Sequence, residues 1–289
     1  MSSACVFWHP VRRLMSSVHG DDFTTAGPHE SLEWFKKELQ KKYELKEGAR
    51  LGPGPQDDKE GRVLNRIVRW EPEGLTYEAD PRHQEKFIQE LGLDDNGEGP
   101  SVKSVSTPCI KLSAEQLSED KPLPESKVTH FRGLAARANY LAADRPDLQY
   151  ASKEVCRWMQ NPMESSVTAL KRIARYLIGR LRLVFKYPWQ DAFGGDVDAD
   201  TDWAGCIRTR KSTTGGVLMI GKHLIKSWSS TQPSVTMSSG EAEMVGVTKA
   251  AAAALGFRSL LSDLGLEWQV RVWTDSTAFI GMCSRQGLG

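Results

Sequence analysis

Three acidic side chains in the C-terminal third of the sequence are of the type that binds divalent metal ions. Asp200 lies late in a segment with strand periodicity, and Asp275 closes the strand-like run RVWTDS. Glu243 lies in the first turn of a long expected helix, four residues before Val247 and seven before Ala250 of its apolar stripe. Its side chain is therefore expected on the face that packs on the sheet, close to the strand ends.

These three carboxylates repel one another if the sheet brings them together. At about 4 Å each pair costs about 4 kcal/mol with an effective dielectric constant of about 20, so cations or protons must share the site. Mg2+ or Mn2+ prefers such hard oxygen ligands. Two such ions about 3.5–4 Å apart can activate a water and stabilise the leaving oxygen of a phosphodiester. A structural alternative stays open, because the helix dipole favours an N-terminal Glu and because Asp is common in turns.

Other acidic residues have simpler explanations. The sequence SSGE that ends at Glu241 matches the capping-box pattern, which gives this side chain a structural role. The alternating aspartates at 196–202 imitate a calcium-binding loop, but the required glycine and closing Glu are missing, so we reject a calcium site. Asp21 and Asp22 lie at the expected tip between two strands, where they either coordinate a metal or form a turn.

Composition excludes several classes of protein. The chain has 289 residues, a formal net charge of +1, 39% hydrophobic and 26% charged residues, which is typical of a globular protein of about two domains. No uninterrupted apolar run approaches the roughly 18 residues of a membrane helix, and the N-terminus has no signal-peptide core. The five cysteines are widely spaced, without a C-x-x-C pair. We therefore expect an intracellular protein, cytoplasmic or nuclear, that does not associate with a membrane.

The near-zero net charge hides an uneven distribution. Residues 1–126 carry a net charge of −6 (17 basic and 23 acidic residues), residues 127–190 carry +8 (12 and 4), and residues 191–289 carry −1 (9 and 10). A basic block of this kind is either a footprint for polyphosphate or a solvated helical surface. Its most basic helix carries Lys171, Arg172 and Arg175.

The first part of the chain alternates expected strands and helices. Short apolar runs at 4–8 and 14–18 suggest a hairpin, and a helix with apolar residues at three- and four-residue spacing follows the break at 27–28. A second strand pair is expected at 63–70 and 75–79, after which Pro81 can open a helix as its first residue. Residues 101–126 continue a Gly-, Pro- and Ser-rich stretch and are predicted to be a linker.

The remaining chain divides into a helical part and a mixed part. Helices are expected at 131–143, 148–160 and 165–179. From about 191, the patterns predict three strands, the last two joined by the three residues 221–223, then a helix from 239 to 264, a strand at 270–274 and a helix from 276. The sequence therefore predicts an α+β or mixed α/β protein with a mixed sheet and a helix packed against it.

Several sequence blocks resemble the ribonuclease H domain of copia-type LTR retrotransposon polyproteins. The stretch Asp198–Val247 (DADTDWAGCIRTRKSTTGG…SWSS…SSGEAEMVGV) is similar to that family's D-A-D-W-A-G, R-K-S-T-S-G, I-S-W-S-S and S-S-x-E-A-E blocks, and TDSTAFI is similar to D-N-x-S-A-I. Upstream, HFRGLAARANYLAADRPDLQYA and ALKRIARYLIGRLRLVFKY resemble further blocks of the same polyproteins. VHGDDF takes the position of the reverse transcriptase Y-V-D-D box, with His19 and Gly20 in place of Tyr and Val.

The resemblance implies roles for individual residues. Asp200, Glu243 and Asp275 correspond to three metal ligands of ribonuclease H, and Asp21 and Asp22 to two metal ligands of the polymerase palm. The implied cofactor is Mg2+ or Mn2+. The family also has a third polymerase aspartate, which would precede residue 1, and a fourth ribonuclease H acid with a nearby histidine, which would follow residue 289.

The implied organisation is a fragment of a polyprotein. It has a partial reverse transcriptase palm (1–100), a linker (101–126), a helical thumb or connection region (127–190) and a ribonuclease H-like domain truncated at its C-terminus (191–289). The implied reaction is hydrolysis of RNA in RNA–DNA hybrids, attached to an incomplete RNA-directed DNA polymerase, with Lys171, Arg172 and Arg175 holding backbone phosphates. The alternative is an inactive nucleic-acid-binding remnant. Expected partners are RNA–DNA hybrids or other nucleic acid, and other parts of the same polyprotein.

Overall fold

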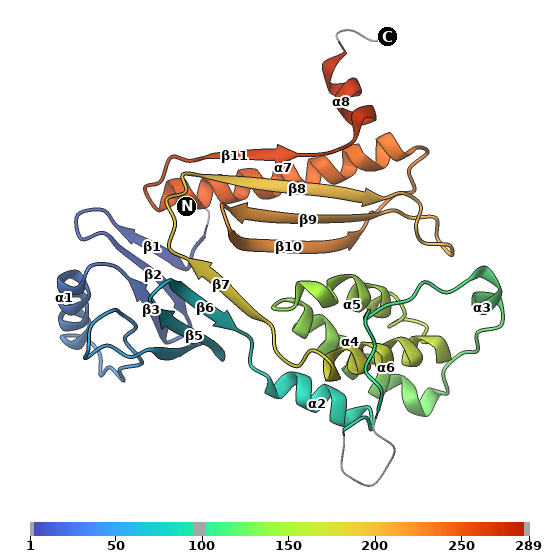
Figure 1. The fold of residues 1–289 in the computed structure, drawn as a ribbon, viewed down its shortest axis with the longest axis horizontal. Helices are drawn as coiled ribbons and strands as arrows, with labels where there is room; N and C mark the ends of the chain where they lie inside the picture. The colour runs from blue at the N-terminus through green and yellow to red at the C-terminus, as the bar shows by residue number, and fades with distance from the viewer. Residues whose placement is uncertain (1–2, 95–101, 286–289) are drawn as a thin grey trace.

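Three β-sheets and several helices make up the computed structural model, which describes residues 3–94 and 102–285 (Figure 1). Two of the sheets are antiparallel, and all their strands but one come from the first third of the chain. The third sheet is mixed. The predicted α+β class with a mixed sheet is therefore confirmed.

The first sheet is the hairpin expected at the N-terminus, extended by one further strand. Its strands pair in the order β1 (Val6–His9), β2 (Leu14–His19) and β3 (Asp22–Ala26), and α1 (His29–Gln40) follows. His19 pairs with Asp22, so β2 and β3 are joined by two residues, of which Gly20 has a φ of 64°. A left-handed residue is what a two-residue hairpin turn requires.

The second sheet corrects the sequence interpretation in two places. Its strands pair in the order β4 (Glu60–Val63), β5 (Arg66–Glu71), β6 (Gly74–Glu78) and β7 (Val184–Pro188). The single strand expected at 63–70 is broken by a turn at Leu64 and Asn65, whose φ angles of 47° and 65° are both left-handed. The end of the predicted helical region forms β7 instead, which pairs with β6 more than a hundred residues earlier.

The helical part matches the expected helices closely. It contains α2 (Arg82–Glu90), α3 (Ala114–Ser118), α4 (Glu125–Ala142), a 3-10 turn (Pro146–Leu148), α5 (Gln149–Cys156) and α6 (Glu164–Ile178). Pro81 precedes α2 as its N-cap and not as its first residue, and α5 ends four residues earlier than expected. These helices share one core, centred on Phe87, Phe131 and Leu170.

The predicted linker contains a helix and is attached to this core at its end. Ser113 caps α3 through a complete capping box with Gln116. Pro122 forms a bridge with Met163, and the amide of Leu123 donates to the carbonyl of Pro162 at 2.9 Å. Residues 95–101, at the boundary between the expected palm and linker, lie outside the described residues.

The third sheet has the predicted order of elements. Its elements are β8 (Gly194–Asp202), β9 (Thr213–Ile220), β10 (His223–Thr231), α7 (Ser239–Asp263), β11 (Gln269–Trp273) and α8 (Thr277–Ser284). The strands lie in the order β10-β9-β8-β11, and β11 runs parallel to β8. Ile220 pairs with His223, so two residues join β9 to β10, where three were expected; Gly221 takes the left-handed φ of 53°.

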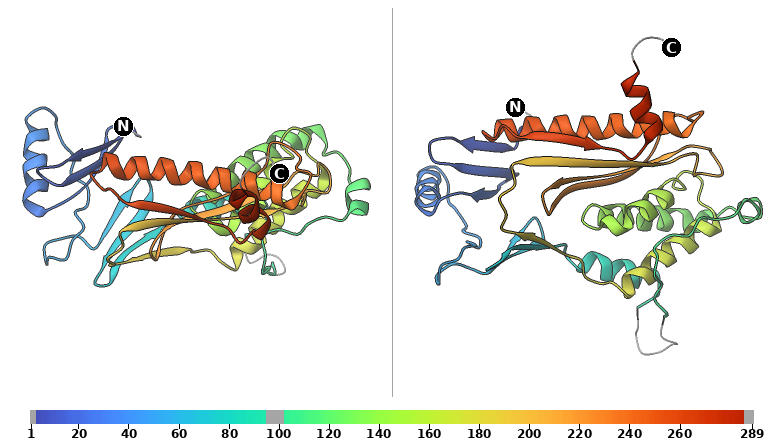
Figure 2. Two further views of the ribbon diagram at one scale, coloured as in Figure 1. Left: turned by 90° about the horizontal axis from the view of Figure 1, so that it is seen from above. Right: turned by 45° about the horizontal axis from the view of Figure 1, so that its top comes forward.

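One face of this sheet is covered by α7, which runs along its length (Figure 2). Val197, Leu218, Ala250 and Ala254 form the core between them. In the described part of the chain, α7 is also the one helix long and apolar enough to cross a membrane, judged by length and composition alone. The sequence prediction considered only uninterrupted apolar runs and therefore did not identify this helix. A helix that packs on a sheet inside a protein can have the same length and apolar composition.

Candidate functional site

Asp200 and Asp275 lie at the same edge of the third sheet. Asp200 is near the carboxyl end of β8, and Asp275 follows β11 by two residues. The last pair of the parallel ladder joins Asp198 to Trp273, so Asp275 comes level with Asp200 as the two chains continue. Both aspartates are exposed, and Asp200 Oδ1 accepts a hydrogen bond from the amide of Thr201 at 2.8 Å. The parallel pairing thus brings together residues 75 positions apart in the sequence.

Glu243 reaches this edge from the first turn of α7. The helix begins after Ser238, whose hydroxyl accepts a hydrogen bond from the amide of Glu241 at 3.1 Å. Glu241 accepts a hydrogen bond from the amide of Met237 at 2.6 Å, one residue before the N-cap Ser238. It therefore has a structural role at the start of α7, but not through the reciprocal bond to Ser238 that the predicted capping box requires. Glu243 lies two residues further on, on the sheet-facing side, and is only 9% exposed. The two glutamates therefore have different environments, as their positions on the helix predict.

The electrostatics link Glu243 to both aspartates. Burial raises the pKa of Glu243, and the charges of Asp200 and Asp275 raise that pKa further. Glu243 Oε2 is buried and has no hydrogen-bond partner among the described residues. A buried carboxylate oxygen without a partner is costly unless a proton or a cation satisfies it. The donor set is therefore chemically suited to a divalent cation.

The side chains are close enough to interact but are not drawn tightly together. Among the described residues, no three His, Cys, Asp or Glu side chains converge as a ready-made metal-binding group. Charge–charge effects extend further than ligand bonds of about 2.0–2.6 Å, so both observations hold together. A cation bound between them would offset the repulsion that Glu243 experiences from the two aspartates.

An open depression lies beside these residues, on the face of the sheet opposite α7. It has a volume of about 560 Å3 and is bordered by Asp200, Asp275, Trp273 and Gly215. Gly215 pairs with Asp200, and a Cβ there would meet only the carbonyl oxygen of Asp200, at 4.0 Å. The glycine therefore leaves the floor of the depression open next to the carboxylates.

Sequence reasoning missed two residues that hold the helix against the sheet. Gln232 donates to the carbonyl of Ala242 at 2.8 Å and to Thr214 Oγ1 at 3.0 Å, which ties the start of α7 to β9. Gly246 allows a close approach, because a Cβ there would lie 2.5 Å from Thr201 Oγ1. A glycine inside a helix costs about 1 kcal/mol, so its presence was a detectable sign of packing. Gln232 had no comparable sequence signal.

The second predicted pair of metal ligands lies at the opposite end of the molecule. Asp21 and Asp22 occupy the tip of the β2–β3 hairpin, and both are exposed. In Figure 1 this hairpin lies at the left, whereas β8 and β11 end at the right. The turn geometry expected for this pair is therefore present, and Asp21 and Asp22 do not join the three carboxylates of the third sheet.

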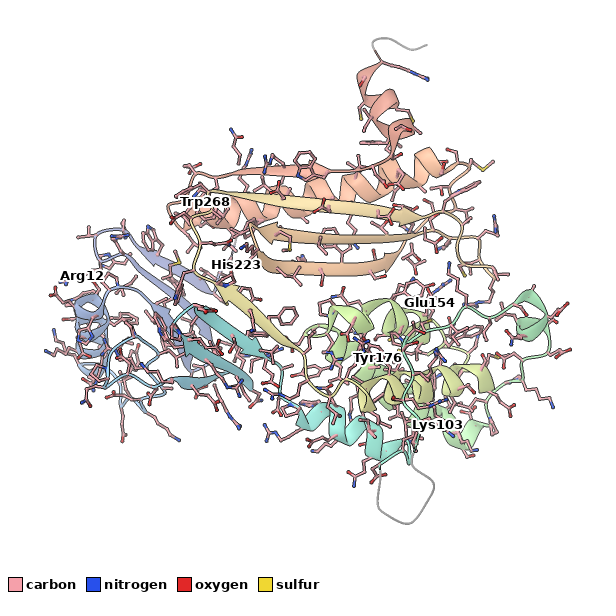
Figure 3. All side chains as sticks on the ribbon, viewed as in Figure 1. Arg12, Lys103, Glu154, Tyr176, His223 and Trp268 are labelled. Carbon is pink, nitrogen blue, oxygen red and sulfur yellow. The ribbon has the colours of Figure 1, made fainter. Side chains whose placement is uncertain are left out.

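Two of the three predicted phosphate-binding residues of α6 make contacts within the chain. Arg172 Nη2 donates to Thr107 Oγ1 at 2.9 Å, and Arg175 Nε donates to the carbonyl of Lys103 at 2.8 Å (Figure 3 labels Lys103). Both side chains thus hold the segment before α3 against the helix, whereas Lys171 is exposed. This contact was not visible in the sequence, because the partners are backbone and hydroxyl groups about 65–72 residues away.

The same holds for most of the basic block at 127–190. Nine of its twelve cationic side chains donate to, pair with or stack on other parts of the chain: Arg132, Arg137, Arg145, Lys153, Arg157, Arg172, Arg175, Arg180 and Arg182. These contacts help to stabilise the fold, while Arg132, Lys171 and Arg182 of the block remain exposed to solvent.

The fold and these side chains define a mixed α+β protein with a carboxylate site at the edge of a mixed sheet. No protein-family profile matches the chain, and no solved structure is significantly similar to it. Curated relatives do exist. The uncharacterized mitochondrial protein AtMg00810 of Arabidopsis thaliana is 32% identical over 178 residues, which cover 61% of this chain and 69% of that protein.

Two retrotransposon polyproteins are also similar. The retrovirus-related Pol polyprotein from transposon RE2 of Arabidopsis thaliana is 34% identical over 168 residues, 58% of this chain and 11% of the polyprotein. The corresponding polyprotein from transposon TNT 1-94 of Nicotiana tabacum is 27% identical over 97% of this chain, which spans 21% of its length. The chain belongs to this family, the copia-type retrotransposon Pol polyproteins and AtMg00810, as a distant member that matches only a small part of the polyproteins.

Proposed function

We propose that the third sheet and α7 form a ribonuclease H-like domain that hydrolyses RNA in RNA–DNA hybrids with Mg2+ or Mn2+. The observation that carries the proposal is the buried Glu243 oxygen without a partner, next to the charges of Asp200 and Asp275. The mixed sheet with one packed helix supports it, because this is the architecture that the family resemblance implies. The preceding part, with Asp21 and Asp22, is proposed to correspond to part of a reverse transcriptase palm.

The three carboxylates would bind the metal ion from two sides of this sheet edge. Glu243 provides a ligand from the buried side, and Asp200 and Asp275 provide ligands from the open side, facing the depression. A bound divalent ion supplies an activated water and stabilises the leaving oxygen of the phosphodiester. The chain itself contributes a fixed position for each carboxylate, since Gln232 anchors the first turn of α7 and the β8–β11 ladder fixes the aspartates. The open depression gives an extended strand access to them.

Cleavage of a labelled RNA–DNA hybrid by the purified chain, in the presence of Mg2+ or Mn2+, tests this proposal. Asp200→Asn and Glu243→Gln should each reduce cleavage by at least about a hundredfold, because each removes one negative charge from a site that must neutralise a cation. Glu241→Gln is the matched control: it lies on the same turn, loses the same charge and should keep cleavage within a fewfold of wild type. Unchanged cleavage by Asp200→Asn would refute the assignment.

A second candidate is a nucleic-acid-binding remnant without catalysis. It is favoured by the absence, in the described ranges 3–94 and 102–285, of three acidic, His or Cys side chains that converge as a metal-ligand group. Hybrid binding that weakens with salt, without cleavage in either metal, would select this candidate over the hydrolase. In both cases the proposed partner is nucleic acid, together with other parts of the same polyprotein.

A further inference from the structure

A compact group of cations lies in the loop between β8 and β9, residues 203–212. Arg208, Arg210 and Lys211 occur within the six residues 206–211, which contain no acidic residue. The loop leaves β8 directly after Asp202, so it lies at the same edge of the sheet as Asp200. In the described part of the chain, none of the three cations forms an ion pair. In the same described residues, the side chains of Arg208, Arg210 and Lys211 also donate no hydrogen bond to another residue, whereas most cationic side chains at 127–190 do.

The loop is held in one conformation by contacts to α5 and to its own backbone. Arg157, just after α5, donates from Nη2 to Cys206 Sγ at 2.9 Å and to Thr209 Oγ1 at 3.0 Å. The amide of Arg210 donates to the carbonyl of Cys206 at 2.7 Å. Figure 1 shows the loop extending from the right-hand end of the sheet toward α5. The cations are therefore presented from a fixed support, which lowers the entropic cost of binding a ligand.

The backbone of this loop stores strain. Ala204 has a φ of 49° and Arg210 a φ of 55°, both left-handed values in residues that carry a side chain. Such conformations cost about 1 kcal/mol or more each, and they concentrate at ligand-binding sites where the surroundings enforce them. Here the enforcing bonds come from the loop and its neighbours, since the amide of Ala204 donates to Ser212 Oγ at 3.0 Å.

One guanidinium group is oriented by an aromatic ring. Arg208 lies over the ring of Trp158, with 4.4 Å between its central carbon and the ring centroid. Stacking occupies the flat face of the guanidinium group and leaves its N–H edge available for a planar or tetrahedral anion. A phosphate group matches this donor edge.

Two acidic residues beside the loop, Asp202 and Glu154, are already paired with other cations. Asp202 forms an ion pair with Lys111 at 2.7 Å, and Glu154 pairs with both Lys153 and Arg157 (Figure 3 labels Glu154). They therefore do not neutralise the three loop cations. The positively charged loop therefore lies beside the exposed carboxylates of Asp200 and Asp275. Positive charge next to an acidic site is what allows a polyanion to approach it.

We propose that Arg208, Arg210 and Lys211 bind the phosphate backbone of the nucleic-acid strand that passes the carboxylate site. This inference takes the identity of the ligand, a nucleic-acid strand, from the proposed function. The expected loss of affinity on removing the loop cations does not depend on whether the chain cleaves that strand. The loop cations would then provide phosphate contacts in addition to Lys171 of α6, whereas Arg172 and Arg175 each donate a hydrogen bond to the segment before α3. Phosphate contacts of this kind fix the position of the strand without reading its sequence.

Fluorescence anisotropy with a labelled RNA–DNA hybrid tests the inference, in EDTA so that no metal-dependent cleavage occurs. We expect the triple variant Arg208→Gln, Arg210→Gln, Lys211→Gln to bind about tenfold more weakly at about 0.1 M salt. The dependence of log K on log salt should become shallower by roughly 2 to 3, about 0.9 for each lost phosphate contact. The matched control is Lys186→Gln, Lys222→Gln, Arg258→Gln, which removes three exposed cations elsewhere and should retain wild-type affinity and slope. Circular dichroism and thermal melting establish that both variants are folded.

The outcomes separate this inference from the proposed reaction. Tight binding by wild type and weak binding by the loop variant support the inference, even when the chain cleaves no hybrid in Mg2+ or Mn2+. Equal affinities and equal salt slopes for wild type and loop variant overturn it, even when cleavage is observed. Equal weakening by the loop variant and the control also overturns it, because the effect would then follow net charge. Failure of wild type to bind at low salt overturns it as well.

Discussion

Buried ionisable side chains separate into two kinds in this protein, according to whether every polar atom has a partner. Arg145, 1% exposed, donates to both carboxylate oxygens of Asp147 at 3.0 and 2.7 Å, to Gln84 Oε1 at 2.6 Å and to the carbonyl of Arg180 at 3.0 Å. Glu243, 9% exposed, leaves one buried oxygen without a partner among the described residues. The first arrangement stabilises the fold, and the second is expected where a ligand completes the set.

Arg145→Met should destabilise the chain by roughly 3 kcal/mol, because it leaves the buried Gln84 without its partner and removes the ion pair of the partly exposed Asp147, which keeps only its hydrogen bond from Tyr176. The free energy of unfolding, measured in urea, checks this prediction. Arg258→Met, at an exposed position of α7, is the control and should change the same quantity by no more than about 0.5 kcal/mol. Equal effects of the two substitutions would show that the buried network contributes nothing of its own.

At the scale of secondary-structure elements, one carboxylate links three strands of the second sheet. Glu78 of β6 accepts hydrogen bonds from Arg182, just before β7, at 2.5 and 2.7 Å, and from Arg69 of β5 at 3.0 Å. Its side chain is 6% exposed. The hydrogen bonds from Arg182 lower the pKa of Glu78, against the opposing effect of burial, and Arg69 lowers it further. The charged carboxylate thereby helps to fix the long-range β6–β7 pairing.

This lowered pKa predicts a pH dependence with a definite sign. The folded state holds the proton of Glu78 less tightly than the unfolded state, so Glu78 stabilises the fold above its ordinary pKa of 4.5. That contribution is lost as pH falls through the lower, folded-state pKa. Glu78→Gln should therefore cost about 2 kcal/mol at pH 7, and the difference from wild type should shrink below about pH 4.5.

Unfolding free energies across this pH range measure the effect. Glu60→Gln is a suitable comparison, since Glu60 also pairs with Arg69 but is 53% exposed, and should cost less than about 1 kcal/mol at pH 7. A Glu78→Gln penalty that stays constant, or grows, toward acid would contradict the assignment of the stabilisation to the ionised carboxylate.

At the scale of the whole molecule, α5 and the residue that follows it connect the helical part to the third sheet. Gln149 donates to the carbonyl of Ser227 at 3.2 Å, Lys153 to Thr213 Oγ1 at 2.8 Å, and Arg157 to Cys206 and Thr209 of the β8–β9 loop. Their four-residue spacing places all three on one face of the helix. The orientation of the β8–β9 loop thus depends on Arg157, about 50 positions earlier in the sequence.

Arg157→Leu should release the loop without unfolding the helical core. Loss of two hydrogen bonds from a partly buried guanidinium group is worth about 1–2 kcal/mol, so amide hydrogen exchange in residues 203–212 should accelerate roughly tenfold. Exchange in α4 and α6 should stay within about twofold of wild type. Arg132→Leu is the control, because Arg132 donates to the carbonyls of Met159 and Gln160 and not to this loop. Uniform acceleration across both regions would contradict the prediction.

The sequence by itself determined most helices, the elements of the third sheet and the placement of Asp200, Glu243 and Asp275 at element ends. These features follow from local periodicity and from capping residues such as Ser238, which act within a few residues. Only the tertiary structure decided that residues 184–188 form a strand beside β6, that Arg172 and Arg175 hold the segment before α3, and that one oxygen of Glu243 has no partner. Each of these depends on groups that meet across long sequence separations, and such contacts leave no periodic signature in the segments that make them.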